Sequence, residues 1–318
     1  MAEPARISVV IPVHNGERYI EQTIRSVLAS DIGALEILVV DDGSRDRSAE
    51  VVSDVKDPRI TLMQHSASGG PSRPRNVGIA HAQAPYVAFL DADDLIRPDK
   101  LSSTIDMLDR TPDAGFAFGE FEHIDADDRV LEASVLAYKL ADCGIKSELI
   151  SNSWHVIPRH ELQRGLLQRN FIGTSGVVVR KKILARVGGF DETLVYSEDL
   201  DLWFRLAHHC SALYRDTVGH SYRLAPGSLT YAPSIRTAQD RITVLRRERR
   251  RRSTRNERRQ LDRLIADSLA AIGYAHRHNR QPVPSALAFA RAFVAHPNFR
   301  WARALVGSLM ASDKSGSP

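Results

Sequence analysis

Along the first hundred residues, each short run of apolar residues is followed by a longer amphipathic segment. The β-branched run at 7–13 is typical of a strand that helices cover on both faces. Apolar residues then recur at helical spacing between Ile20 and Leu28. The cycle repeats, with strands predicted at 36–40, 59–63 and 86–90 and helices beginning near Arg45 and Pro74. Strands that alternate with helices predict right-handed crossovers and a mostly parallel sheet.

Beyond Pro98 the pattern is less regular. It predicts a helix after Pro98, a hairpin at 116–124 and 130–135, a strand at 177–179, and a short helix from Lys181 to the glycine pair at 188–189. The polar segment 137–170 gives no assignment, and from Ile235 onward the sequence is helical without a strand signal. We therefore expect an α/β catalytic domain at 1–232 and a helical extension at 233–318.

Composition narrows the class of protein. The chain has 318 residues, of which 43% are hydrophobic, enough for a large core. No apolar run approaches the roughly 20 residues of a membrane-spanning helix, and the first six residues lack the pattern of a secretory signal. Cys143 and Cys210 are too widely spaced for a zinc site or a disulfide framework, so we interpret both as structural thiols. These features predict a soluble, cytoplasmic protein.

Two acidic clusters follow predicted strands: Asp41-Asp42-Gly43-Ser44 and Asp91-Ala92-Asp93-Asp94. Taken singly, an Asp-Gly pair is most simply a turn. The carboxyl ends of parallel strands, however, open onto one ligand crevice. A carboxylate of the first cluster could accept a hydrogen bond from a pyrimidine imide or approach a ribose, and two aspartates one residue apart can bind a hard divalent cation. A calcium hand is disfavoured by Leu95 and Ile96. The sequence predicts a metal and nucleotide site.

The same four letters recur at Asp125-Ala126-Asp127-Asp128. This copy lies between two predicted strands, so we interpret it as a solvated hairpin turn. Its context separates it from the copy at 91, which follows a buried strand and precedes a helix.

Two further segments carry candidate chemistry. The glycines at 69 and 70 precede a predicted helix whose positive end, with Arg75, suits a diphosphate, although a flexible loop with a surface arginine fits equally well. Glu198 and Asp199 fall in the first turn of a predicted helix, with Ser197 as its N-cap. The helix dipole there favours the ionised carboxylate that a general base needs, and also accounts for acids at a helix start without any function.

Six motifs together resemble family 2 glycosyltransferases of the GT-A fold, in order and separation, from about 7 to 230. They are Val10-Ile11-Pro12-Val13-His14-Asn15-Gly16, Asp41-Asp42-Gly43-Ser44, Pro74-Arg75-Asn76-Val77-Gly78, Leu90-Asp91-Ala92-Asp93-Asp94, Val187-Gly188-Gly189-Phe190-Asp191-Glu192 and Glu198-Asp199. The resemblance implies a Rossmann-like sheet flanked by helices. It also implies inverting transfer of one sugar from a nucleotide-sugar, commonly a UDP-sugar, with Mg or Mn as cofactor.

The resemblance also implies residue roles. Asp91 and Asp93 match the DXD motif, in which Asp93 binds the metal directly, and Asp199, with Glu198 beside it, matches the catalytic base. The donor nucleotide would be bound by Pro12, Val13 and Glu17 around the base and ribose, by Asp42 or Asp41 reading the base, and by Arg75 near the diphosphate. In this reaction a cation neutralises the leaving diphosphate, while a carboxylate on the opposite side of the anomeric carbon deprotonates the acceptor hydroxyl.

Two departures from the family pattern refine the expectation. Ala225 stands where family members often carry a histidine, so the sequence leaves a third protein ligand to the metal or phosphate unassigned, although His220 lies nearby. The glutamine-arginine-tryptophan motif of polymerising members is absent after residue 199. We expect addition of one sugar to a hydroxyl of a cell-envelope polysaccharide, glycolipid or other glycan, with 137–170 shaping the acceptor site.

An arginine-rich run extends from Arg246 to Arg259. A solvated basic helix is the simplest interpretation, followed by peripheral contact with anionic lipid at the inner face of the membrane, near a lipid-linked acceptor. A nucleic-acid-binding protein is an alternative, disfavoured because no aromatic residues interleave the run. A sugar nucleotidyltransferase is another, but the segment 13–17 is a poor match to a triphosphate loop.

Overall fold

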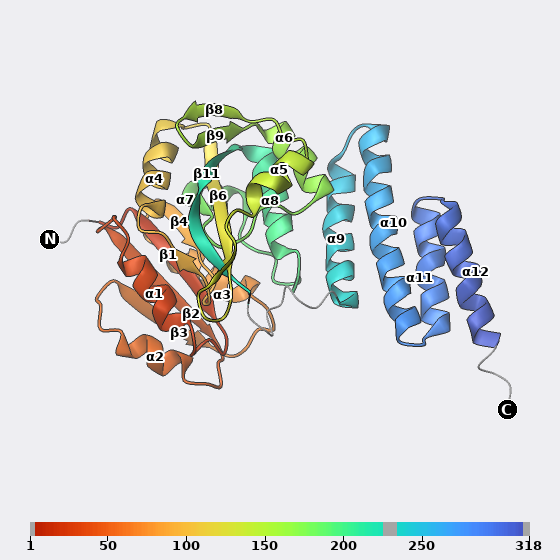
Figure 1. Ribbon diagram of the computed structural model, residues 1–318, viewed down its shortest axis with the longest axis horizontal. Coiled ribbons are helices and arrows are strands. Elements are labelled where there is room, and N and C mark those ends of the chain that lie inside the picture. The colour runs from red at the N-terminus through yellow and green to blue at the C-terminus, as the bar shows by residue number, and fades with distance from the viewer. Residues whose placement is uncertain (1–3, 225–233, 314–318) are drawn as a thin grey trace. The chain divides into compact units, whose positions relative to one another are not determined.

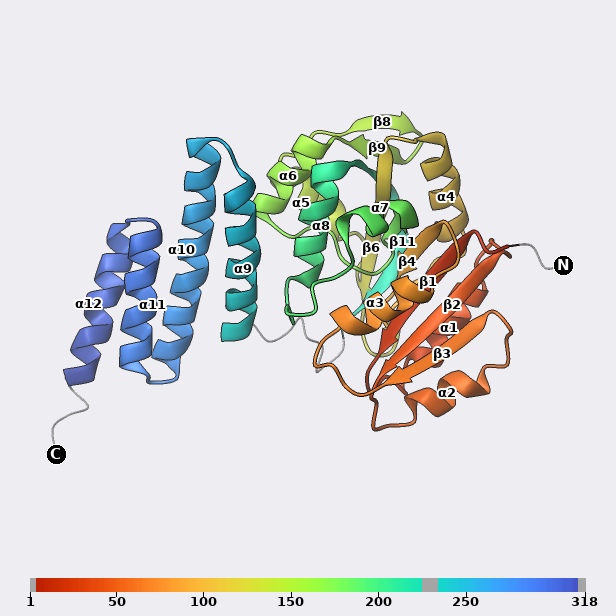
Figure 2. The same cartoon turned by 180° about the vertical axis from the view of Figure 1, so that it is seen from behind.

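The N-terminal third of the chain forms the predicted parallel sheet. Its strands lie in the order β3-β2-β1-β4 and all pair in parallel. They are β1 (Ile7–Val13), β2 (Leu35–Asp42), β3 (Ile60–His65) and β4 (Tyr86–Phe89). Helices α1 (Ile20–Leu28) and α2 (Ser48–Asp54) cover one face and α3 (Ser72–His81) covers the other (Figures 1 and 2). Because both faces are covered, β1 and β2 are almost continuously apolar.

The second part of the sheet is mixed. Strand β10 (Val178–Arg180) lies antiparallel between β4 and β6 (Ala114–Ile124), and β11 (Ser211–Arg223) runs parallel to β6. The antiparallel strands β9 (Trp154–Ile157) and β8 (Glu148–Ser151) complete the order, while β5 (Leu95–Ile96) pairs with β11. The predicted hairpin is confirmed, because β7 (Val130–Glu132) pairs with β6. The sequence pattern did not predict β11, whose pairing with β6 shifts register between Arg215 and His220.

The structure, a computed structural model, describes residues 4–224 and 234–313. The expectation at Ala225 lies outside these residues. The helices of this part are α4 (Lys100–Arg110), α5 (Leu136–Asp142), α6 (Arg159–Gln168), α7 (Lys181–Val187) and α8 (Glu198–His209). The segment that the pattern left unassigned thus contains α5, β8, β9 and α6. Gly188, at φ 83°, ends α7 as the glycine pair predicted.

Helix α8 is held against the sheet by an aromatic cluster. Trp203 is fully buried, its ring is parallel to that of Phe116, and its indole N–H donates to the carbonyl of Ile172 at 3.0 Å. Burying one such side chain stabilises the fold by about 3 kcal/mol. The first turn of α8, with Glu198 and Asp199, is therefore fixed relative to the sheet.

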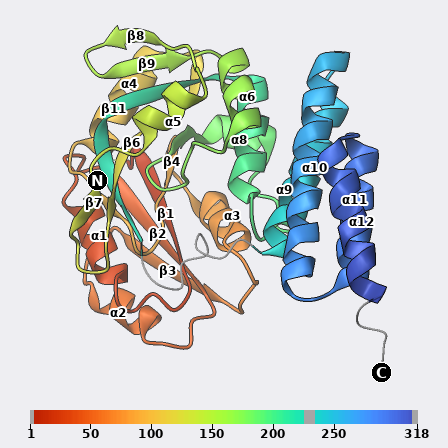
Figure 3. The same cartoon turned by 45° about the vertical axis from the view of Figure 1, so that its right-hand side comes forward.

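A second compact unit consists of Leu194–Ser197 and the C-terminal helices. These are α9 (Ile235–Arg251), α10 (Arg255–His278), α11 (Pro282–Ala295) and α12 (Phe299–Asp313), which pack in chain order as a row (Figure 3). The Asp240 carboxylate accepts hydrogen bonds from the backbone N–H groups of Val195 and Tyr196, each at 3.0 Å. Among the described residues, no helix has both the length and the hydrophobicity needed to cross a membrane.

Candidate active site

The first acidic cluster lies at the carboxyl end of β2, and both carboxylates are buried. Asp42 accepts hydrogen bonds from the backbone N–H and the hydroxyl of Ser68, each at 2.9 Å, and lies 3.2 Å from His65. Asp41 accepts from the backbone N–H of Ser44 and from Gln64. The two aspartates therefore join the turn after β2 to the loop after β3. That turn requires glycine at Gly43, where φ is 68° and a Cβ would lie 2.5 Å from a backbone nitrogen.

Three other expected donor-binding residues lie at the end of β1 and just beyond it. Val13 is buried and Pro12 is half-buried, and β1 lies between the strands that carry the two acidic clusters. Glu17 is exposed, and its carboxylate accepts a hydrogen bond from the backbone N–H of Arg47 at 2.8 Å. The shared edge of three adjacent parallel strands thus carries all of these residues.

The three aspartates of the loop Asp91-Ala92-Asp93-Asp94, here called the DXD loop, have different surroundings. Asp94 is fully buried and accepts hydrogen bonds from the Ser175 hydroxyl and from the backbone N–H of Arg223. Asp91 accepts from Arg75 at 2.7 Å. Asp93 has neither a salt bridge nor a side-chain hydrogen bond within the described part of the chain. Burial, with the neighbouring charge of Asp91, raises the pKa of Asp93 to about 6.

The DXD loop fits a hard divalent cation that takes few protein ligands. Asp93 offers an unpaired carboxylate, and the repulsion between Asp91 and Asp93 would be relieved by a cation. Within residues 4–224 and 234–313, no group of three or more His, Cys, Asp or Glu side chains gathers as a metal site. The remaining ligands would have to be phosphate and water, as is usual for Mg²⁺.

Arg75 joins the two acidic segments that are far apart in the sequence. It lies in the first turns of α3 and is 3% exposed. Its guanidinium donates to Asp91 at 2.7 Å and to Glu198 at 2.8 Å, and it lies over the ring of Phe190. Burial opposes the charge of Arg75, but the two carboxylates outweigh burial and raise its pKa. A permanent cation therefore lies between the DXD loop and α8.

Glu198 and Asp199 begin α8 beside this arginine. Burial, with the charge of Asp199, raises the pKa of Glu198 to about 7. Asp199 is half-buried and accepts hydrogen bonds from the Asn170 side chain at 2.8 Å and from the N–H of Leu200. Burial also raises the pKa of Asp199, and the bond from Asn170 opposes that rise. Ser197, the expected N-cap, has a φ of 59°.

The Asn170 bond predicts the direction of a pH effect. If Asp199 acts as a base, kcat/KM falls as pH falls through its raised pKa, because protonation removes the base. Asn170→Ala removes a hydrogen bond to the ionised form, so we expect this acid limb to move upward by about one pH unit. The plateau rate at high pH should change by less than about threefold. A pH–rate profile of both proteins measures this, and a limb that stays in place or moves downward would contradict it.

Sequence reasoning did not identify three residues that contact these acids. Ser175 donates its hydroxyl to Asp94 and accepts from the backbone N–H of Asp91, and Asn170 bonds Asp199. Arg223 contacts the DXD loop from the end of β11. The glycine-flanked segment 173–176 was a usable signal for Ser175, whereas Asn170 follows α6 in a segment without a readable pattern.

The sequence of this chain is similar to a family model and to individual known proteins. The family model described as glycosyl transferase family 2 matches residues 8–186. An uncharacterized glycosyltransferase from Haemophilus influenzae is 38% identical over 104 residues, 32% of this chain and 42% of that protein. One from Rickettsia conorii is 30% identical over 204 residues, 63% of this chain and 31% of that protein. The matches thus span less than half the length of either relative.

Solved structures share the fold at low sequence identity. S. aureus TarS in complex with UDP-GlcNAc is 18% identical, with a TM-score of 0.67 over 92% of this chain and 82% of that chain. Mannosyltransferase PcManGT from Pyrobaculum calidifontis, in complex with GDP-Man and Mn2+, is 19% identical, with a TM-score of 0.56 over 98% and 81%. These likenesses confirm the predicted fold class, a Rossmann-like GT-A sheet followed by helices.

Proposed function

The chain belongs to glycosyl transferase family 2, and from this premise we propose that it moves one sugar from a nucleoside-diphosphate sugar to a hydroxyl acceptor, with inversion. A UDP-sugar is the donor to test first, with a GDP-sugar second, since fold neighbours hold UDP-GlcNAc and GDP-Man. The acceptor would belong to a cell-envelope polysaccharide, a glycolipid or another glycan. The observation that carries the proposal is the contact of Arg75 with both Asp91 and Glu198.

Asp199 is the proposed base. An in-line displacement needs a carboxylate on the side of the anomeric carbon opposite the leaving diphosphate, to take the proton of the acceptor hydroxyl. Asn170 and the N–H of Leu200 orient this carboxylate and favour its ionised form. Glu198, paired with Arg75, holds the start of α8 against the DXD loop.

The donor would lie along the edge formed by β1, β2 and β4. Pro12, Val13 and Glu17 are proposed to contact base and ribose, with Asp41 or Asp42 accepting from the base, and Arg75 to lie near the diphosphate. Asp93, assisted by Asp91, is proposed to bind Mg or Mn, with phosphate and water as the other ligands. Such an ion would neutralise the charge that builds on the leaving nucleoside diphosphate.

The test is a panel of UDP- and GDP-sugars with Mg or Mn, in which donor binding and slow release of nucleoside diphosphate are measured. We expect one donor to be hydrolysed only with metal, and Asp93→Asn to lower the rate at least about 100-fold. The matched control is Asp127→Asn, the equivalent change in the exposed copy of the motif, which should retain the rate. Hydrolysis that survives both EDTA and Asp93→Asn would overturn the metal assignment, and absence of binding across the panel would overturn the donor class.

We also propose that the C-terminal helices contact anionic lipid, through α11 and α12 rather than the arginine run. The run is partly neutralised by its own unit, since Arg249 pairs with Asp262, and Arg251 and Arg252 pair with Glu248. No acid occurs between Asp267 and Asp313. Two exposed stripes in this region each combine three apolar side chains with one arginine: Val283, Leu287, Arg291 and Val294, and Phe299, Arg303, Val306 and Met310. Such faces suit a membrane surface.

Vesicle binding tests this contact. We expect the protein to sediment with vesicles containing phosphatidylglycerol and not with pure phosphatidylcholine, because arginines without nearby acids favour anionic headgroups. Phe299→Ser with Met310→Ser should lower the partition coefficient at least about tenfold. Leu131→Ser is the control, since Leu131 is also an exposed apolar residue but lies in the β7 strand. Equal binding to both vesicles, or self-association that the double variant abolishes without any vesicle binding, would contradict the proposal.

A further inference from the structure

The buried arginine at the end of β11 lies directly behind the DXD loop. Arg223 is 1% exposed, and its backbone N–H donates to the carboxylate of Asp94 at 2.8 Å. Its side-chain Nε donates to the backbone carbonyl of Asp93, also at 2.8 Å. Arg223 therefore holds two successive residues of the DXD loop, one through its main chain and one through its guanidinium.

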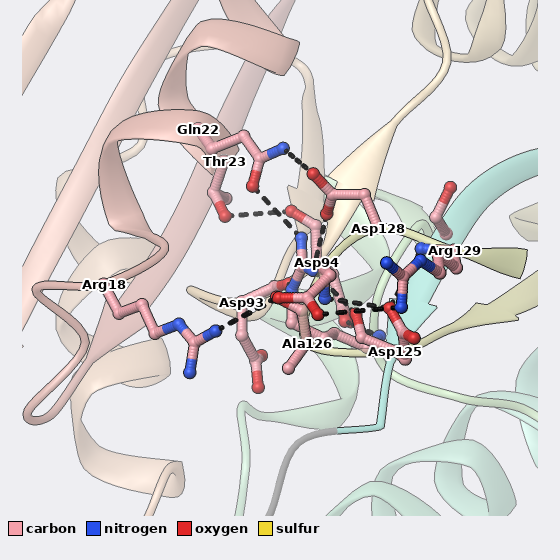
Figure 4. Close-up of polar contacts among 12 residues, drawn as sticks. Arg18, Gln22, Thr23, Asp93, Asp94, Asp125, Ala126, Asp128 and Arg129 are labelled. Atoms are coloured by element: carbon pink, nitrogen blue, oxygen red, sulfur yellow. Dashed lines mark hydrogen bonds and ion pairs between the residues drawn. The ribbon is translucent and has the colours of Figure 1, made fainter.

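The other guanidinium nitrogens of Arg223 contact two different elements. Nη1 donates to the carbonyl of Asp125 at 2.9 Å and pairs with the Asp128 carboxylate at 2.6 Å, both in the β6–β7 turn. Nη2 donates to Gln22 of α1 at 3.1 Å, and the guanidinium lies 4.4 Å from the centre of the Tyr19 ring. Figure 4 shows how the DXD loop, α1 and this turn converge. One side chain thus connects three segments that are remote in the sequence.

The turn and α1 are also joined to each other and to the DXD loop. Gln22 donates to Asp128 at 2.7 Å, and Arg18 donates to the carbonyl of Ala126 (Figure 4). The Thr23 hydroxyl lies 2.9 Å from the carbonyls of Ala92 and Asp94. The copy of the acidic motif at 125–128 is therefore more than a solvated turn, because its backbone and Asp128 complete the surroundings of Arg223.

Within the DXD loop, the Arg223 guanidinium bonds a backbone carbonyl. An arginine beside a pair of carboxylates normally forms bidentate salt bridges with them. Here the guanidinium bonds the Asp93 carbonyl instead, and its charge is paired with Asp128. The Asp93 carboxylate consequently keeps no salt bridge among the described residues. Asp128 is thus the counter-ion of Arg223.

We propose that Arg223 is a positioning residue for cation binding: together with Asp128 and Gln22 it fixes the DXD backbone so that the Asp93 carboxylate remains unpaired and oriented for a divalent cation. This inference rests on the proposed function, since it takes Asp93 as the metal-binding residue. Residues that orient metal ligands typically change metal affinity about 10- to 100-fold when replaced.

The test uses the full chain with Mn²⁺ and UDP or GDP, and measures bound Mn²⁺ by electron paramagnetic resonance. We expect Arg223→Lys to weaken Mn²⁺ binding at least about tenfold, because lysine keeps the charge but cannot reach the same partners. Asp128→Asn should weaken it about fivefold. Asp128 has a φ of 66°, which asparagine tolerates, so this surface variant keeps the turn even where a change at Arg223 impairs folding.

Two controls separate positioning from a general structural effect. Asp127→Asn changes the neighbouring acid of the same turn, which pairs with Arg18 and Arg129 rather than Arg223, and should leave Mn²⁺ affinity unchanged. Nucleotide affinity in EDTA should stay within about twofold in every variant. In the double variant, Asp128→Asn should add almost nothing to Arg223→Lys, because both act through one contact.

Failure of the proposed function and failure of the positioning role of Arg223 give different results. If the unmodified protein binds no Mn²⁺ with either nucleotide, the proposed function itself fails. If it binds Mn²⁺ and folded Asp128→Asn and Arg223→Lys bind it equally well, the positioning role is overturned. Additive losses in the double variant, or an equal loss in Asp127→Asn, would also overturn it.

Discussion

Replacing Asp199 by asparagine should lower kcat of sugar transfer about 1,000-fold and leave donor affinity nearly unchanged. Asparagine keeps the shape of the side chain and the oxygen that accepts a hydrogen bond from the N–H of Leu200. It removes the carboxylate that takes the proton from the hydroxyl of the acceptor substrate. Because Arg75 bonds Glu198 and not Asp199 in the first turn of α8, the donor side of the site should stay intact. Single-turnover transfer and donor titration calorimetry on the same preparation measure the two quantities.

The matched control is Asp201→Asn, the same substitution two residues along α8. The Asp201 carboxylate pairs with Arg205 at 2.8 Å, so its loss should affect stability and change kcat less than about threefold. Transfer that persists in Asp199→Asn but disappears in Glu198→Gln would assign the base to Glu198. Transfer that persists in both variants would remove the base from this helix altogether.

The parallel half of the fold was predictable because its physics is local. Strands β1, β2 and β4 are covered on both faces, so burial makes each an almost continuous apolar run, and the turn after β2 needs a glycine that the sequence displays. Strand β11 was not predictable in this way. Its middle residues are exposed at a register shift and its second half is mostly polar, so the apolar signal is confined to residues 212–214.

The same distinction applies to the candidate site. The DXD loop and the pair at 198–199 could be recognised because each motif is contiguous and lies at the end of an element. Their connection could not, since Arg75 and Glu198 are 123 positions apart and a single arginine has no pattern. The contacts of Arg223 were even harder to predict from the sequence. Its contacts come from α1, the DXD loop and the β6–β7 turn, and only the folded β11 brings them together.

Arg75→Met should be the most destabilising single change at the site. Removing the cation leaves Asp91 and the buried Glu198 without their partner, and breaking a buried ion pair from one side typically costs about 3–5 kcal/mol. For a unit of this size we expect thermal unfolding about 10 °C lower. Transfer should fall at least about 100-fold, because the segments that carry Asp93 and Asp199 lose their common tether.

The pH dependence of unfolding tests why Arg75→Met loses stability. Arg75 lowers the pKa of Glu198, which burial raises to about 7 even with the arginine present, so in Arg75→Met this pKa should lie higher still. The stability deficit of the variant should therefore shrink as pH falls from about 9 towards about 7, because the unpaired Glu198 carboxylate becomes protonated. Arg73→Met is the control, an exposed arginine of the same helix, and should shift unfolding by less than about 2 °C. Unfolding curves from about pH 5 to about pH 9 measure both variants. A deficit that does not change with pH would mean that lost packing against Phe190, rather than unpaired charge, makes Arg75 necessary.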